Sequence, residues 1–194
     1  QTIQPIEPDH PRIEYIGRVD KTDPKKPRFG FSGVSIQCKF SGEMIEVMFS
    51  STTDKNYYFY IIDEEKPKKI NIQSQVKKYT LAENLKDTIH ELRLVRLTEG
   101  SQGIDTFEGL ILGGNDSLVT LSQSKKRIFE FYGNSITCGF GNETTNPNDR
   151  YDPAQQNFYY TYGSYVSRIF EAECIGIAKS GIGMYRNHQG PASG

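Results

Sequence analysis

The chain has 194 residues, of which 36% are hydrophobic and 24% are charged, and its formal net charge is −1. This composition is typical of a globular protein that buries a core, and it lacks the basic excess that favours nucleic-acid binding. No apolar run approaches the ~18–20 residues that cross a membrane, and the polar start at Gln1 does not resemble a signal peptide. We therefore expect no nucleic-acid or membrane partner, and a cleaved leader would leave no trace in this sequence.

The first eleven residues are rich in proline and have no hydrophobic period, which predicts an extended or mobile arm over 1–11. From Arg12 the pattern changes to short runs of β-branched and aromatic residues, separated by clusters of Gly, Asn, Asp and Lys. Several runs alternate apolar and polar residues, as strands with one buried face do. Such short strands with close turns predict an antiparallel β-sandwich or jelly roll over 12–122. The strands are expected over 12–19, 34–40, 44–50, 56–63, 69–73, 76–81, 88–97 and 106–112.

A different pattern begins near residue 125. Residues 128–132 predict a strand that ends at Gly133, and Asn157 is expected to cap a helix. The apolar residues of this helix are Phe158, Tyr162, Val166, Ile169 and Phe170. Residues 174–178 predict the next strand. Strand, turn, helix and strand are typical of the start of an α/β domain with a parallel sheet, which we place over 123–194.

Ser135 follows the end of the first of these strands. A nucleophilic serine needs an exposed Oγ, a nearby base and N–H donors aimed at the oxyanion. A strand-to-helix turn supplies the Oγ and the donors, because Gly133 permits a close bend and Asn134 can bond its own turn through its side chain. Ser135 is therefore a candidate nucleophile, and its own N–H is a candidate oxyanion donor. The three residues Gly-Asn-Ser alone also fit a plain hairpin or loop turn, which is the more frequent meaning.

The longer segment 131–142, FYGNSITCGFGN, resembles the first block of the SGNH, or GDSL-like, hydrolases, and most of all that of carbohydrate esterase family 2, the acetylxylan esterases. Segments upstream are similar to the jelly-roll domain that precedes the hydrolase domain in that family. They are 15–20 (YIGRVD), 39–42 (KFSG), 79–82 (YTLA) and 90–92 (HEL). Downstream, 180–187 (SGIGMYRN) is similar to the second block, whose glycine N–H is an oxyanion donor. The resemblance implies that role for Gly181, with Gly183 in reserve.

The sequence departs from the family pattern in two ways. Asn134 replaces the commoner Asp, which keeps the acceptor that organises the turn but loses the charge. The third block, with an Asn oxyanion donor, and the last block, with Asp-x-x-His, are expected beyond Gly194. The base histidine is therefore expected there too, and 123–194 is expected to be only the N-terminal portion of its domain. His188 lies where the family places no base, so we expect it at the surface or at the rim of the substrate site.

The resemblance implies a serine esterase that removes O-acetyl groups from plant-wall polysaccharides, xylan or mannan, through an acyl-enzyme on Ser135. It implies no cofactor, a secreted or periplasmic location, and an acetylated polysaccharide or oligosaccharide as partner. A second polypeptide fragment that completes the α/β domain is a further expected partner. The alternative is a non-catalytic glycan-binding β-sandwich fused to an incomplete hydrolase domain.

Other chemistry-bearing residues are given plainer interpretations. The odd number of cysteines, at Cys38, Cys138 and Cys174, without paired spacing predicts buried or free thiols, and no metal site is expected. The segment 113–116 (GGND) imitates the third block but precedes Ser135, so it is interpreted as a turn. The mixed-charge run 63–69 predicts a solvated hairpin. Two further histidines, His10 and His90, are interpreted as plain polar positions, and three aromatics as core residues: Phe158, Tyr159 and Tyr162.

Overall fold

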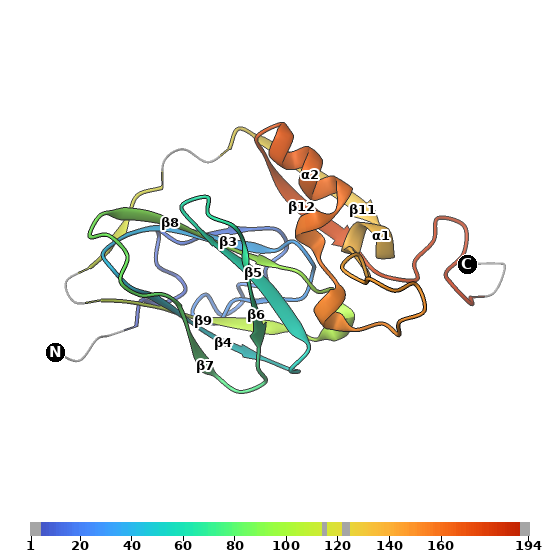
Figure 1. The fold of residues 1–194 in the computed structure, drawn as a ribbon, viewed down its shortest axis with the longest axis horizontal. Helices are drawn as coiled ribbons and strands as arrows, with labels where there is room; N and C mark the ends of the chain where they lie inside the picture. Colours follow the sequence, from blue (N-terminus) through green and yellow to red (C-terminus); the bar gives the residue numbers. More distant parts are fainter. Residues whose placement is uncertain (1–4, 114–115, 122–124, 191–194) are drawn as a thin grey trace.

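A computed structural model describes residues 5–113, 116–121 and 125–190, and the strands of its first part form two antiparallel sheets (Figure 1). The six-stranded sheet has the order β1-β3-β8-β5-β6, with β10 also paired to β3, and the four-stranded sheet has the order β2-β9-β4-β7. The larger sheet contains β1 (Glu14–Ile16), β3 (Ser35–Ser41), β5 (Asn56–Ile62), β6 (Lys68–Ile72), β8 (Ile89–Arg96) and β10 (Leu118–Val119). The smaller sheet contains β2 (Arg28–Phe29), β4 (Ile45–Ser51), β7 (Lys77–Ala82) and β9 (Asp105–Leu112).

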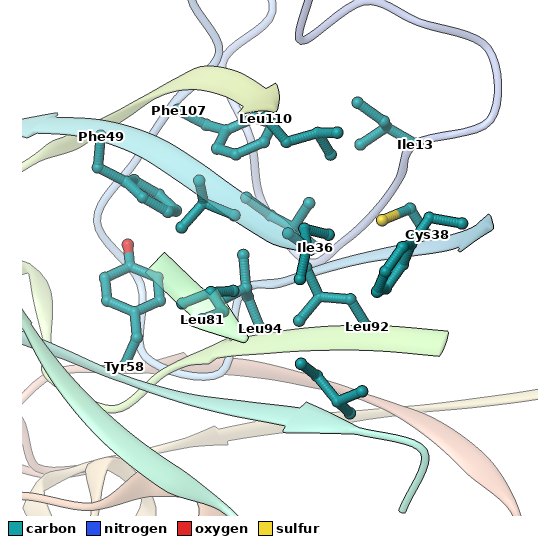
Figure 2. Packing of buried hydrophobic residues seen from close by; sticks show 14 of the residues in the cluster. Ile13, Ile36, Cys38, Phe49, Tyr58, Leu81, Leu92, Leu94, Phe107 and Leu110 are labelled. Carbon is teal, nitrogen blue, oxygen red and sulfur yellow. The ribbon is translucent and has the colours of Figure 1, made fainter. Parts of the chain in front are cut away.

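The two sheets enclose one apolar core, to which strands of both contribute side chains (Figure 2). In β4 the buried and half-buried positions alternate along the whole strand. Phe49 of β4 lies between Tyr58 of the larger sheet and Phe107 of β9, with a ring-centroid distance of 5.1 Å to each. Burial of each large apolar side chain contributes about 1.5–3 kcal/mol, so this alternation accounts for the sandwich. The predicted antiparallel sandwich is confirmed, while the jelly-roll topology stays a prediction.

Several predicted boundaries need correction. The first strand is only three residues long, because Gly17 leaves it with a φ of +105° and packs closely against Val34. The short strands β2 and β10 have no periodic signal in the sequence. The arm is bound to the sandwich at Ile6, which exchanges two backbone hydrogen bonds of 2.7 and 3.1 Å with Leu110, and it then turns, with His10 donating its N–H to Glu7 O at 3.1 Å.

The second part of the chain contains two parallel strands, β11 (Arg127–Gly133) and β12 (Ala172–Ala178), as the sequence predicts. The helices α1 (Ser135–Cys138) and α2 (Tyr162–Ile169) lie between them in sequence. Three short 3₁₀ turns complete the elements: η1 (Gly100–Gln102), η2 (Pro153–Gln155) and η3 (Phe158–Tyr160). Figure 1 shows α2 lying across β12, beside the sandwich.

The predicted helix cap at Asn157 is wrong. The α-helix begins later, and Thr161 is its cap, accepting a hydrogen bond from the backbone N–H of Ser164. Asn157 instead precedes a separate 3₁₀ turn and makes no side-chain cap hydrogen bond, while its Nδ2 donates to Glu143 at 3.0 Å. Phe158 is buried as expected, whereas Tyr162 is 51% exposed and is not a core residue.

The apolar stripe of α2 faces outward, because the helix turns its small residues Gly163, Ser164 and Ser167 toward the sheet. A Cβ on Gly163 would lie only 2.9 Å from the ring of Phe131, so the helix needs glycine there to sit this close. Large exposed side chains therefore gather on this part of the molecule: Ile128, Tyr132, Tyr162, Val166, Ile169 and Phe170. Within the described residues, β11 pairs with β12 alone, so its other edge is open.

The sandwich and the second part share a packed interface. Phe158 lies against Gly33 of the sandwich and Gly176 of β12, where an added Cβ would stand 2.3 and 2.5 Å from its ring. Glu173 of β12 accepts hydrogen bonds from Arg93 at 3.1 Å and from Gln37 at 3.4 Å, and it is buried. The strands of the second part are thus held in place by the larger sheet.

The three cysteines are free and buried, as expected. Burial raises the thiol pKa of both Cys38 and Cys138 to about 12, and it raises the pKa of Cys174 as well.

In the described part of the chain, no group of three or more His, Cys, Asp and Glu side chains is arranged to hold a metal ion. Over the same residues, no helix has the length and apolar character needed to span a bilayer.

Candidate active site at Ser135

Ser135 is the first residue of α1, directly after the turn that follows β11. Asn134 caps α1 by accepting a 3.1 Å hydrogen bond from the N–H of Ile136 through Oδ1, so the amide does the work of the commoner Asp. The turn needs Gly133, because a Cβ there would stand 2.0 Å from Oγ1 of Thr137. The predicted turn-forming roles of Gly133 and Asn134 agree with this geometry, and Ser135 is left half-buried.

The single turn of α1 ends at Gly139, whose φ of +76° is left-handed and whose N–H returns to the carbonyl oxygens of Ile136 and Ser135. A Cβ on Gly139 would stand 2.4 Å from the carbonyl oxygen of Asn157. The backbone N–H of Asn157 donates a hydrogen bond to the carbonyl oxygen of Gly139 at 3.0 Å. The helix that carries Ser135 is therefore fixed at both ends.

Replacing Gly139 with alanine is expected to lower the free energy of unfolding by about 2–4 kcal/mol, since left-handed strain and backbone overlap add together. Gly141→Ala is the matched control, because its φ is +63° but its nearest neighbour, Thr144 Oγ1, is 3.4 Å from an added Cβ. The control should lose only the strain contribution of about 1 kcal/mol. Urea unfolding of both variants measures the difference. Equal losses of unfolding free energy would show that the overlap with Asn157 is relieved by a small backbone shift of little energetic cost.

The loop after β12 forms a tight turn beside Ser135. Lys179 donates its N–H to Gly133 O at 3.2 Å, and Ile182 donates to Lys179 O at 3.4 Å, so Ser180 and Gly181 occupy the centre of the turn. Gly181 has a φ of +83°, which a type II turn requires at its third residue. This is the segment that the resemblance assigns to the second block.

The two segments line one open depression of about 570 Å³. Its lining residues are Asn134, Ser135, Phe140, Ser180, Gly181, Ile182 and His188. Phe140 stacks on Tyr151 with a centroid distance of 4.1 Å and an interplanar angle of 9°, which holds its ring at the edge of the depression. An aromatic rim of this kind was not expected from the sequence.

The backbone donors differ in how they are used. Within the described part of the chain, the N–H groups of Ser135 and Gly181 donate no hydrogen bond, whereas Gly183 donates to Oδ1 of Asn187 at 3.3 Å. Gly181 is therefore better suited than Gly183 to donate to an oxyanion. The roles of Ser135 and Gly181 remain predictions.

None of the described histidines makes a hydrogen bond to Ser135 that would mark it as the general base. His188 lines the depression, and its N–H donates to Gly181 O at 2.7 Å. His90 is buried, and its ring nitrogens bond Asp63 and the carbonyl oxygen of Lys86, so it is more enclosed than a plain polar position. His10 accepts from the N–H of Arg12 in the arm. The segment 113–116 includes two residues outside the described part, and Asp116 donates its N–H to Gly113 O at 2.9 Å, as a turn does.

Glu99 is a neighbour of the site that sequence reasoning missed. It lies between β8 and β9 of the sandwich, and its carboxylate accepts hydrogen bonds from the N–H of Ser180 at 2.7 Å and from its Oγ at 2.5 Å. No motif surrounds this residue. Only the packing of the sandwich against the second part could reveal the contact.

Comparison with known proteins places the chain among the carbohydrate esterases. A family model described as Carbohydrate esterase 2 N-terminal matches residues 15–121, which is more than half of the chain. The chain belongs to carbohydrate esterase family 2, and the resemblance seen in the sequence is confirmed.

Two curated proteins illustrate the relationship. The chain is 32% identical over 182 residues to Cellulase/esterase CelE of Acetivibrio thermocellus, covering 94% of this chain and 22% of that protein. It is 28% identical over 166 residues to an acetylxylan esterase / glucomannan deacetylase of Cellvibrio japonicus, covering 84% of this chain and 44% of that protein. The chain thus spans less than half the length of both curated relatives.

Solved structures agree with the fold. A family two carbohydrate esterase from Clostridium thermocellum, in complex with cellohexaose, superposes with a TM-score of 0.87 at 32% identity, over 92% of this chain and 54% of that chain. A family two carbohydrate esterase from Cellvibrio japonicus superposes with a TM-score of 0.89 over 98% of this chain and 56% of that chain. Its 21% identity makes it a comparison of fold alone.

Proposed function

We propose that the protein to which this chain belongs is a serine esterase that removes O-acetyl groups from plant-wall polysaccharides, xylan or mannan. The observation that carries the proposal is that Ser135 and Gly181 line one open depression, and that each has an N–H that donates no hydrogen bond in the described part of the chain. The relatives support the class of reaction, since they are named as esterases and deacetylases of carbohydrates.

In the proposed reaction, Ser135 Oγ attacks the acetyl carbonyl carbon while a histidine takes the hydroxyl proton. The N–H groups of Ser135 and Gly181 donate to the oxyanion of the tetrahedral intermediate. The intermediate then collapses with cleavage of the bond between the acyl carbon and the sugar oxygen, and the histidine protonates that oxygen, so that the sugar leaves as a free hydroxyl and an acetyl-enzyme remains on Ser135. Attack by water on the acyl carbon, with the histidine as base, releases acetate and restores the serine. No cofactor is proposed for these steps.

We propose that the base histidine and a third oxyanion donor belong to a segment that corresponds to the part of the relatives not covered by this chain. The outward-facing side chains of α2 and β11, together with the open edge of β11, fit burial by further strands and helices of an SGNH-type α/β domain. A longer chain or a second polypeptide fragment can supply them. We also propose that the protein acts outside the cytoplasm, secreted or periplasmic, where its polysaccharide substrate is found.

The test is acetate release from acetylated xylan and acetylated glucomannan by the 194-residue chain and by a protein extended to the length of its relatives. The extended protein is expected to release acetate from at least one of the two substrates. EDTA is expected to leave the rate of acetate release unchanged. The 194-residue chain is expected to be inactive, because general-base assistance typically contributes ~10²–10⁴-fold. Adding the remaining portion as a separate fragment should restore activity.

Two results would contradict the proposal. Efficient turnover by a homogeneous 194-residue chain would make an internal group the base, with His188 the first to replace. Binding of the glycans by the extended protein without acetate release would instead favour the rival function, a non-catalytic glycan-binding sandwich with an incomplete hydrolase domain.

A further inference from the structure

Glu99 is a buried carboxylate that reaches from the sandwich into the candidate active site. Only 1% of the residue is exposed. Both carboxylate oxygens are used: Oε2 accepts from the N–H of Ser180 and Oε1 accepts from its hydroxyl. The thiol of Cys138 also donates to Oε2, at 3.7 Å. A buried carboxylate is costly unless it is hydrogen-bonded in this way, so these contacts define its place.

The groups that Glu99 contacts belong to the two segments of the candidate site. Cys138 is the last residue of α1, the helix that begins at Ser135. Ser180 directly precedes Gly181, the proposed second oxyanion donor. One side chain of the sandwich therefore contacts both segments that have to be aligned for the reaction.

The contact with Ser180 bears on the direction of the Gly181 N–H. This N–H belongs to the peptide group between Ser180 and Gly181, which is the central peptide of the turn after β12. The common turn types differ by a flip of that central peptide, which would point the N–H the other way. Glu99 holds the residue on one side of this peptide, and the N–H of His188 holds the Gly181 carbonyl oxygen on the other side at 2.7 Å.

The loop that carries Glu99 is itself held by a fully buried arginine. Arg96 donates from Nε to the carbonyl oxygen of Thr98 at 2.9 Å and from Nη2 to that of Gly103 at 2.6 Å. Its Nη1 pairs with Asp105 at 2.6 Å. The backbone on both sides of Glu99 is thus anchored in the sandwich core.

We propose that Glu99 is a positioning residue for the esterase reaction, supplied by the sandwich, which holds Ser180 so that the Gly181 N–H faces the oxyanion. The inference rests on the proposed function. It gives the sandwich a part in catalysis besides any binding of glycan, because the oxyanion site is complete only when the sandwich is docked.

The experiment measures kcat and KM for 4-nitrophenyl acetate in the extended protein. Glu99→Ala is expected to lower kcat about 10²-fold with KM changed less than about threefold, which is the effect of losing one oxyanion donor. Glu99→Gln is expected to keep kcat within about tenfold of wild type, since its amide can accept from the Ser180 N–H and donate to Ser180 Oγ. Glu173→Ala is the matched control, a buried carboxylate of the same interface that does not contact Ser180, and it should leave kcat within about threefold.

A folded Glu99→Ala protein with kcat within threefold of wild type would overturn the inference, as would an equal loss in Glu173→Ala. If Glu99→Ala does not fold, Ser180→Ala decides: a fall of roughly tenfold in kcat supports the inference and an unchanged kcat overturns it. Failure of the proposed function is distinct, because the extended protein would then release no acetate or its activity would survive Ser135→Ala. If activity is lost in Ser135→Ala but unchanged in Glu99→Ala, the inference about Glu99 is overturned and the proposed function stands.

Discussion

Replacing Ser135 with alanine in the extended protein is expected to lower acetyl-ester hydrolysis by about 10⁴-fold or more, because the acyl-enzyme can no longer form. The fold should persist, since Ser135 is half-buried and the side chain of Asn134, not of Ser135, caps α1. Acetate release and the urea midpoint measure the two effects separately.

The matched control is Ser101→Ala, an exposed serine of η1 whose loss should change neither quantity. Residual activity of Ser135→Ala within tenfold of wild type would show that the nucleophile lies elsewhere. A large shift of the urea midpoint would show instead that Ser135 has a structural role that its contacts do not indicate.

Replacing Arg96 with alanine is expected to lower the free energy of unfolding of the sandwich by about 3–5 kcal/mol. Neither Arg96 nor Asp105 is exposed, and the carboxylate also accepts from Tyr58 at 2.6 Å and from Asn56 at 2.7 Å. Burial and the adjacent Asp105 raise the pKa of Tyr58 well above its usual value, so its phenol remains a neutral donor. Removing the guanidinium leaves Asp105 as a buried charge without its cation, which is the source of the loss.

The comparison is Lys78→Ala, which breaks the pair between the exposed Lys78 and the half-buried Glu46 and should cost about 0.2–1 kcal/mol. The double variant Arg96→Ala/Asp105→Ala should lose less than the sum of its single variants, because the unpaired charge is gone. Urea unfolding measures the free energy of unfolding of the two single variants, the double variant and Lys78→Ala, each against the wild type. A loss of less than about 1 kcal/mol in Arg96→Ala would mean that water enters the core and replaces the arginine.

Much of the secondary structure could be predicted because it depends on local pattern. Alternation along β4, and the strand signals at 128–132 and 174–178, are properties of short segments, and strands are found there, the last of them beginning two residues earlier than predicted. The start of α2 could not be predicted in this way. Asn157 and Thr161 are both good caps by residue type, and the 3₁₀ turn that separates them leaves Thr161 as the cap of α2.

By itself, the sequence determined the sandwich, the parallel pair of strands, the turn at Ser135 and the family, because each depends on residues close together in the chain. Only the tertiary structure decided that Gly181, and not Gly183, keeps an unused N–H in the described part of the chain. It also decided that Glu99 touches the site, through hydrogen bonds to a residue 81 positions away in sequence. Hydrogen bonds over such separations depend on how the sheets pack, and no local pattern encodes that packing.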